Sequence, residues 1–304
     1  MTRIFISSIM PANHQHWATR MKRTVYLNGE YLPEDEAKIS IFDRGVLFGD
    51  AIYEVGGVID GKIISFDSHM ARYRRSLAEL QLPMPLNEEE VLAAFRKLVE
   101  LNAIDEGLVY MQITRGAADR EFVWQDNLKP TVFMFTQHKP DDEHDKIKTG
   151  VKLKSTDDIR WARRDIKSVN LLGQVLAKKI AYDAGAYEAL MIDDDGFVTE
   201  CGSMSFFMVR DNEILTRPLN NNILSGITRK SLFTLCEKHD IKLIERKFTL
   251  AEALAADEAM ISGASSYVMP VSIIDEQPIG SGKPGPWFQR LYDIYVHYAR
   301  ETAI

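Results

Sequence analysis

The chain has 304 residues, of which 45% are hydrophobic and 27% are charged, a composition typical of a globular protein with a large core. Its formal net charge of -7 argues against a general nucleic-acid-binding protein, because affinity for a phosphate backbone needs a dense basic surface. The sequence has no uninterrupted apolar run of about 18 residues, which excludes an ordinary membrane-spanning helix.

The two cysteines, Cys201 and Cys236, show no CxxC spacing and have no histidine set beside them, so we predict neither a disulfide nor a metal site. A reduced, cytoplasmic protein is the expected class. Residues 1–20 hold only a short apolar patch before Pro11, which is too weak for a secretory signal. We predict that they form an N-terminal extension that is disordered or a non-native start, with Met21 as the natural first residue.

Two dipeptides typical of tight turns, Asn28-Gly29 and Asp60-Gly61, each separate a pair of apolar, strand-like runs. They predict one hairpin over residues 25–32 and another over residues 51–66.

Helix signals follow the second hairpin. Ser68 predicts the cap of a helix over about residues 69–80. Asn87 and Glu90 predict a capping box for a helix that ends near residue 101.

Apolar strands are predicted at 108–114 and 131–136, on either side of an irregular loop at 115–129. Pro140 and a charge run make 139–150 the best linker candidate. Beyond it, strands are expected at 151–153, 188–192 and 205–209, and helices at 171–184, 228–239 and 287–300. These patterns divide the chain into a small α/β domain at 21–138, an interdomain linker at 139–150 and a larger, barrel-like domain at 151–304.

Lys167 stands out because it lies between Ile166 and Val169 in an apolar, strand-like run, where a strongly hydrated ammonium is seldom buried without compensation. A lysine that forms a Schiff base is one explanation, and a surface lysine beside a helix start is the other. Glu200 follows on a separate predicted strand. An amine and a carboxylate on two elements indicate cofactor chemistry.

The sequence has no GxGxxG after a predicted strand and no GxxxxGK(S/T), HExxH or GxSxG run, so the common nucleotide, zinc-protease and serine-hydrolase interpretations lose their usual support. An anion can still bind where the polar turn at 220–225 leads into a helix. Gly226 lets the backbone approach closely, and the free N–H groups of the helix start suit phosphate together with the Thr228 hydroxyl. A plain capping motif is the alternative. A second small-residue turn, at 262–266, offers further amides and hydroxyls.

Seven separated segments share one pattern: Arg44 to Asp50, Tyr53-Glu54-Val55, His69 to Arg72, Gln112 to Gly116, Asp165 to Leu172, Val198-Thr199-Glu200 and Asn222 to Arg229. In this order they resemble the fold-type IV pyridoxal-phosphate transaminases, and among them the D-amino-acid transaminases, over about residues 25–295. The resemblance implies an α/β fold of two domains, a small two-layer N-terminal domain and a larger pseudo-barrel C-terminal domain. The cofactor, pyridoxal 5'-phosphate, is expected in the cleft between them.

The resemblance implies that Lys167 forms a Schiff base with the cofactor and then moves the substrate proton as general base and acid. Glu200 is expected to partner the pyridine nitrogen, where a carboxylate keeps the ring protonated. The remaining cofactor residues are expected to hold the phosphate or pack on the ring: Arg72, Gly226, Ile227, Thr228 and Ser265 for the phosphate, and Leu224 for the ring.

On the substrate side, the resemblance implies that Tyr53 donates to a carboxylate and that Arg120 belongs to a carboxylate trap that reaches into a neighbouring subunit's site. The family pattern pairs that arginine with a histidine two positions on, whereas this chain has Phe122. The carboxylate is therefore held differently, and bulkier or less charged substrates are expected. Gly56 and Gly57 are interpreted as making the pocket roomier.

Transamination of D-amino acids such as D-alanine, with 2-oxoglutarate or pyruvate as acceptor, is the function that the resemblance implies, in a homodimer without nucleic-acid or membrane partners. Branched-chain L-amino-acid or (R)-amine transaminase activity is the alternative, and aminodeoxychorismate lyase activity a further one. The family's branched-chain members carry a tyrosine where this chain has Leu172, and its lyases an arginine where this chain has Leu171. Two alternatives lie outside the transaminases: an aldolase-type enzyme that uses Lys167 as a Schiff-base lysine without a cofactor, and a non-enzymatic protein that stores the cofactor. The early hairpins argue against the aldolase barrel.

Overall fold

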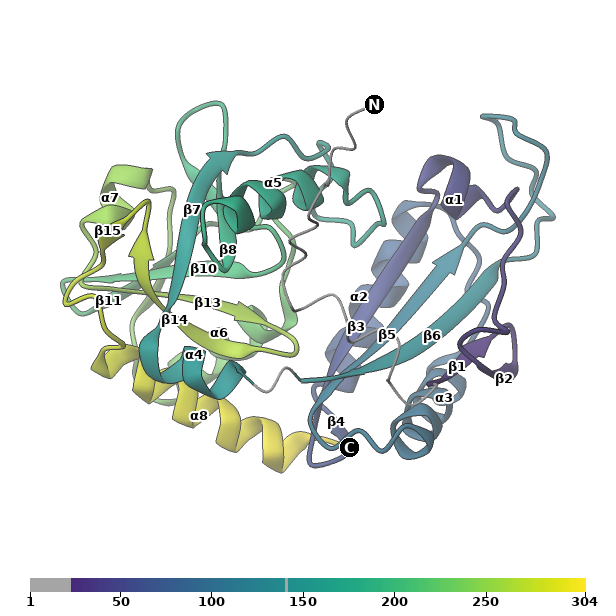
Figure 1. Cartoon of the computed structure of the whole chain (residues 1–304), viewed down its shortest axis with the longest axis horizontal. Helices are drawn as coiled ribbons and strands as arrows, with labels where there is room; N and C mark the ends of the chain where they lie inside the picture. The colour runs from purple at the N-terminus through teal and green to yellow at the C-terminus, as the bar shows by residue number, and fades with distance from the viewer. Residues whose placement is uncertain (1–22, 140–141) are drawn as a thin grey trace, which may run out of the picture.

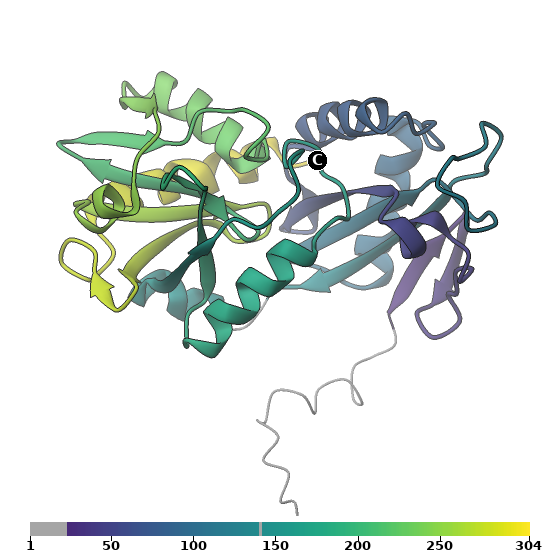
Figure 2. The same ribbon diagram turned by 90° about the horizontal axis from the view of Figure 1, so that it is seen from above.

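The computed structural model describes residues 23–139 and 142–304. The predictions for residues 1–20 and for Met21 fall outside this part of the chain. Two lobes lie side by side: the first holds the elements up to β6 and the second those from α4 onward (Figures 1 and 2). In the described part of the chain, none of the helices has the length and apolar character needed to cross a bilayer.

The first lobe is a six-stranded antiparallel sheet in the order β2-β1-β6-β5-β3-β4, against which helices α2 and α3 pack (Figure 1). Its elements are β1 Thr24–Leu27, β2 Glu30–Pro33, α1 Arg44–Phe48, β3 Ala51–Ile59, β4 Lys62–Ile63, α2 Phe66–Glu79, α3 Glu88–Leu101, β5 Gly107–Thr114 and β6 Thr131–His138. On β5 every second residue, Val109, Met111 and Ile113, is fully buried in the core beneath the helices.

Both predicted hairpins form, although the second strand of the hairpin predicted over residues 51–66 ends at Ile63. Asn28 and Gly29 join β1 to β2 with φ angles of 50° and 102°, and Asp60 and Gly61 join β3 to β4 with φ of 50° and 71°. Positive φ at both central positions is what the twist of a two-residue hairpin requires.

The helix predicted from residue 69 begins earlier. Strand β4 ends at Ile63, and α2 already starts at Phe66, so Ser68 lies inside the helix and does not cap it. Phe66 is buried in the core of the first lobe, and Asp67 places a negative charge at the N-terminal end of the helix dipole. Helix α3 has the predicted capping box between Asn87 and Glu90.

The second lobe is built on a nine-stranded mixed sheet in the order β12-β11-β10-β13-β14-β7-β8-β9, with β15 paired to β14, that curves into a half-barrel (Figure 1). Its elements are α4 Glu143–Thr149, β7 Val151–Asp157, α5 Leu172–Asp183, β8 Glu188–Ile192, β9 Val198–Cys201, β10 Ser205–Arg210, β11 Glu213–Thr216, α6 Ile227–Lys238, β12 Leu243–Glu245, α7 Leu250–Leu254, β13 Glu258–Gly263, β14 Tyr267–Ile274, β15 Gln277–Pro278 and α8 Pro286–Thr302. The segment predicted as a linker is therefore not irregular throughout, because α4 occupies most of it.

The lobes are joined at two further places. The backbone of Lys167 to Val169 pairs with the free edge of β3: Tyr53 N donates to Lys167 O over 2.9 Å, and Val169 N to Ala51 O over 3.1 Å. At the other end, Ile63 and Ile304 exchange two backbone hydrogen bonds, which ties the chain end after α8 to the first lobe.

Candidate active site

A cavity of about 240 Å³ lies where the two lobes meet. Strand β3 and helix α2 line it from the first lobe, and the β7–α5 connection, β9 and the start of α6 from the second. It brings together nine of the residues predicted from the sequence: Tyr53, Arg72, Lys167, Glu200, Leu224, Gly226, Ile227, Thr228 and Ser265.

Lys167 precedes α5 and does not lie in a strand of the large sheet, although Ser168 beside it forms an isolated bridge with Ile52. Its ammonium nitrogen lies 4.0 Å from the centroid of the Tyr53 ring, within range of a cation–π interaction. Among the described residues, no carboxylate lies within ion-pair distance of this amine. The amine is therefore held at the cavity by the paired backbone and an aromatic face, without a salt bridge that a reaction would have to break.

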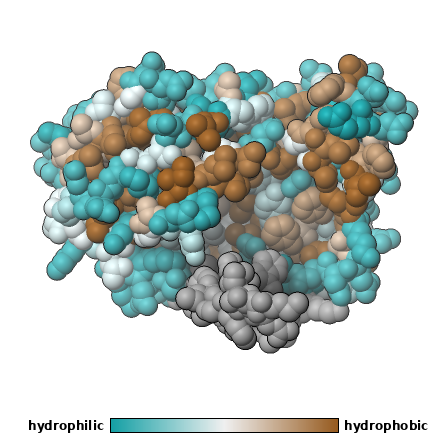
Figure 3. Space-filling view, turned by 45° about the horizontal axis from the view of Figure 1, so that its top comes forward, coloured by the Kyte–Doolittle hydropathy of each residue, from teal (hydrophilic) through white to brown (hydrophobic). Residues whose placement is uncertain are grey.

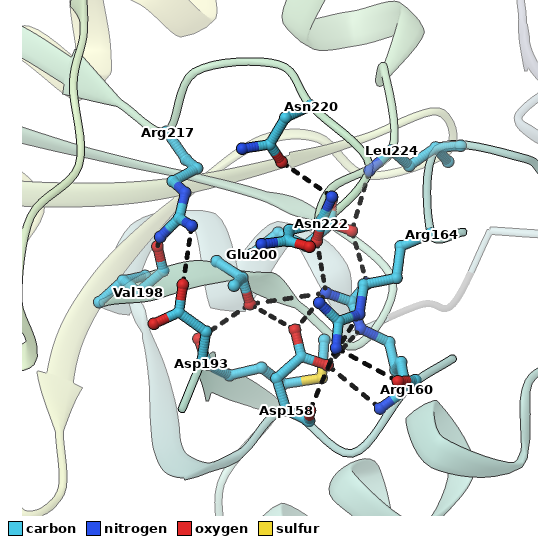
Figure 4. A network of polar contacts seen from close by, with 12 residues as sticks. Asp158, Arg160, Arg164, Asp193, Val198, Glu200, Arg217, Asn220, Asn222 and Leu224 are labelled. Carbon is cyan, nitrogen blue, oxygen red and sulfur yellow. Dashed lines mark hydrogen bonds and ion pairs between the residues drawn. The ribbon is translucent and has the colours of Figure 1, made fainter. Parts of the chain in front are cut away.

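Glu200 is the buried carboxylate at the cavity wall, on β9. Arg160 donates to its Oε1 over 2.5 Å and the Leu224 N–H over 3.1 Å (Figure 4), and both bonds leave Oε2 free for a ligand. Burial raises the pKa of Glu200, and the Arg160 guanidinium opposes that shift.

Arg160 is itself fixed by Asp158, which accepts from Nε over 2.8 Å and from Nη2 over 2.7 Å. Burial lowers the pKa of Arg160, but hydrogen bonds and charges from Asp158 and Glu200 raise it by more, so the guanidinium remains charged. The hydroxyl of Thr199 donates to the same Asp158 carboxylate over 2.7 Å. Sequence reasoning missed this network, because Asp158 and Arg160 lie in a loop and carry no motif.

A second buried ion pair lies on the first-lobe side. Glu54 accepts two hydrogen bonds from Arg72, over 2.7 and 2.8 Å, and contacts His69 Nδ1 at 2.9 Å. Burial alone would raise the pKa of Glu54, but Arg72 and His69 lower it to about 2. Arg72 also donates to the Ser225 carbonyl over 3.0 Å, so three of its five N–H groups are used and two remain.

The start of α6 and the turn after β13 form the polar end of the cavity. The N–H groups in the first turn of α6 have no acceptor within their own helix, and two residues of that turn, Ile227 and Thr228, line the cavity. Thr228 also donates to the Gly263 carbonyl over 3.1 Å, which joins the helix start to the turn. The buried Ser262 hydroxyl on the same lining has no hydrogen-bond partner among the described residues. Unpaired donors beside Arg72 fit an anionic group such as phosphate.

Gly56 and Gly57 do not enlarge the pocket as the sequence suggested. A Cβ atom on Gly56 would meet the Val109 and Ile63 side chains at 3.3 and 3.5 Å, inside the core. A Cβ on Gly57 would lie 2.3 Å from the Ala264 carbonyl oxygen. These glycines permit close packing, and at Gly57 that packing is between the two lobes.

Arg120 and Phe122 do not line this cavity. They belong to the loop after β5, where Phe122 is 76% exposed and Arg120 lies 5.6 Å from its ring. Arg44 holds the loop by donating to the carbonyls of Glu121, over 2.5 Å, and Phe122, over 3.1 Å. If Arg120 acts in a trap, it acts outside its own subunit's cavity.

Residues 51–274 match the family described as Amino-transferase class IV. A D-alanine aminotransferase of Staphylococcus haemolyticus is 39% identical over 90% of this chain and 97% of its own length. One of Bacillus licheniformis is 39% identical over 86% of this chain and 92% of its own length. The T.th. branched-chain amino acid aminotransferase, solved with pyridoxamine 5'-phosphate, superposes with a TM-score of 0.85 at 25% identity over 92% of this chain and 95% of that one. The branched-chain amino acid aminotransferase from Escherichia coli shares the fold. It superposes with a TM-score of 0.81 at 21% identity, over 89% of this chain and 92% of that one. The chain belongs to the class IV aminotransferases.

Proposed function

We propose that this aminotransferase moves the amino group of a D-amino acid, such as D-alanine, to a 2-oxo acid such as 2-oxoglutarate or pyruvate, with pyridoxal 5'-phosphate as cofactor. The observation that carries the proposal is the arrangement of Lys167 and Glu200 on one cavity, beside a set of anion donors. The identity of 39% with D-alanine aminotransferases supports the choice of substrate.

The donors around the cavity suit each part of the cofactor. Lys167 would hold it covalently through its amine, Glu200 would pair with the ring nitrogen through Oε2, and Leu224 would pack on the ring. The phosphate would be held by a set of cationic, hydroxyl and backbone donors: Arg72, Gly226, Ile227, Thr228 and Ser265. When bound, the cofactor supplies an electron sink for the charge that develops at the substrate α-carbon.

The chain's own contribution is placement and proton transfer. The Lys167 amine is the group that takes the proton from the substrate α-carbon, and its backbone bonds to β3 fix where that amine stands. Arg160 and Asp158 hold the Glu200 carboxylate in one orientation. Tyr53 bounds the substrate side, where its hydroxyl can donate to a carboxylate.

A homodimer is part of the proposal. Arg120 stands apart from its own cavity, and its loop exposes Phe122 and Val123 by 76% and 83%. Hydrophobic side chains also border the hollow between the lobes (Figure 3). On α5, Leu172 and Val175 are 71% and 58% exposed. Apolar surface of this kind beside a site favours burial against another subunit. The two buried, unpaired cysteines are consistent with a cytoplasmic enzyme.

A substrate panel tests the proposal. Purified protein with pyridoxal 5'-phosphate is given D-alanine, L-alanine, a branched-chain L-amino acid or an (R)-amine, each with pyruvate or 2-oxoglutarate, and the amino products are quantified. We expect turnover with D-alanine and little with L-alanine. Preferential turnover of the branched-chain L-amino acid or of the amine would replace the D-amino-acid assignment while keeping the family.

A further inference from the structure

The turn formed by Ala264, Ser265 and Ser266 closes the hairpin between β13 and β14. Its closing pair is Gly263 and Tyr267, and Tyr267 has a φ of 56°, a left-handed conformation that is unfavourable for a bulky residue. Such a conformation persists only where the surroundings enforce it. The contacts of Tyr267 therefore decide the shape of a turn that lines the cavity.

The enforcing contact comes from the junction of the two lobes. Lys139, the first residue after β6, places its ammonium 4.0 Å from the centroid of the Tyr267 ring. Its side chain is only 8% exposed, so the charge needs compensation. Two carboxylates provide this compensation. Glu106, in the first lobe, lies 3.5 Å from the Lys139 ammonium, and Glu143, in α4, lies 3.9 Å from it.

Glu143 supports that contact from α4. Its carboxylate lies 3.9 Å from the Lys139 ammonium, so it helps to hold this cation over the Tyr267 ring. Burial raises the pKa of the Glu143 carboxyl, and the Lys139 ammonium opposes that shift. Two charged side chains that do not line the cavity thus hold Tyr267 in place.

A second route runs from Tyr267 to the helix start. The Tyr267 ring packs on Tyr295 with centroids 5.9 Å apart, and the Tyr295 hydroxyl lies 3.4 Å from the Thr228 hydroxyl. Gly57, on the first lobe, also packs closely on this turn, because a Cβ there would lie 2.3 Å from the Ala264 carbonyl oxygen. The turn is therefore enclosed between the lobe junction, β3 and the start of α6.

We propose that Lys139 and Glu143 are positioning residues that fix the turn at 264–266, and so set how tightly the enzyme holds the phosphate group of its cofactor. The proposal rests on the proposed use of pyridoxal 5'-phosphate. Neither residue lines the cavity: Lys139 acts through the Tyr267 ring, and Glu143 acts by holding Lys139.

The first test is amide hydrogen exchange of residues 263–267 in the full chain without cofactor. Lys139→Met keeps an unbranched stem but removes the charge, and exchange at the turn is expected to accelerate by about fivefold, the equivalent of losing one cation–π contact. Lys139→Arg, which restores a cation over the ring, should return it toward the wild-type rate. Lys97→Met is the matched control, because Lys97 makes the same contact with Tyr31, at 4.1 Å, within the first lobe. An unchanged rate in Lys139→Met overturns the proposal.

The second test compares the dissociation constants of pyridoxal 5'-phosphate and of pyridoxal, which lacks the phosphate. Lys139→Met and the shape-conserving Glu143→Gln should weaken the first by about fivefold and leave the second unchanged. Equal weakening of both ligands, or of neither, contradicts the role assigned to the turn. Wild-type protein that takes up neither ligand would refute the proposed function, and the exchange rates would still decide whether Lys139 holds the turn.

Discussion

Glu200 and Arg160 show how a single residue at the site depends on its neighbours. Both hydrogen bonds received by Glu200 go to Oε1, which fixes the carboxylate and leaves Oε2 of this cavity-lining residue free for a ligand. Arg160 would be costly to bury alone, and Asp158 stabilises it with two parallel hydrogen bonds. The charge around Glu200 is therefore set by Glu200, Arg160 and Asp158 together, and of these only Glu200 was predicted.

The lowered pKa of Glu54 predicts that the stability of the fold depends on pH. Its pKa falls from 4.5 to about 2 on folding, so its contribution is fully present above pH 4.5 and is lost as the pH falls toward 2. In Glu54→Gln the unfolding free energy should fall less steeply over this range, because the wild-type protein takes up about one more proton than the variant on unfolding. Denaturant unfolding at successive pH values measures this. Equal slopes in both proteins would show that Glu54 is not the group responsible.

At the scale of elements, the free edge of β3 aligns the two lobes. Its first residues pair with the segment that carries Lys167, and its later residue Gly57 packs against the turn at Ala264. A strand of the first lobe thus reaches both the reactive amine and the polar end of the cavity. This explains why strand β3 has a glycine at position 57, despite the cost of glycine to a strand.

Gly57→Ala tests that contact. The added Cβ would lie 2.3 Å from a backbone oxygen, so the lobes must move apart, and we expect a loss of about 1–3 kcal/mol in stability with weaker cofactor binding. Gly56→Ala is the neighbouring control, because its Cβ would meet only side-chain atoms, at 3.3 Å or more. Thermal unfolding and cofactor titration compare the two. Equal effects of both substitutions would argue against close packing at Gly57.

At the scale of the whole molecule, the cavity is formed from both lobes, but Arg120 stands outside it. Arg120→Ala should weaken the binding of D-amino acids by about 10- to 100-fold, the value of a charge-assisted hydrogen bond to a carboxylate, and should affect amines without a carboxylate far less. The apparent KM for each substrate measures this, with the exposed Arg210→Ala as control. Equal losses for both substrate classes would remove Arg120 from the trap.

Much of this architecture follows from local signals in the sequence. Turn dipeptides such as Asn28-Gly29 and the capping box at Asn87 act within a few residues, so both were predicted. The start of α2 was not, because the burial of Phe66 in the core outweighs the capping preference of Ser68. Resemblance located Lys167 and Glu200, whereas Arg160 depends on contacts across the fold that no local pattern encodes.

In the proposed function, the Lys167 amine holds the cofactor, and every other role at the site depends on that bond. The most direct measurement is reduction of the pyridoxal-phosphate-loaded enzyme with borohydride, followed by proteolysis and mass spectrometry to find the modified lysine. We expect the pyridoxyl group on the peptide that contains Lys167, and no such peptide from Lys167→Ala, which should also lose at least about a hundredfold in turnover while keeping its fold. A stable modification on another lysine, or full turnover in Lys167→Ala, would contradict the role assigned to Lys167.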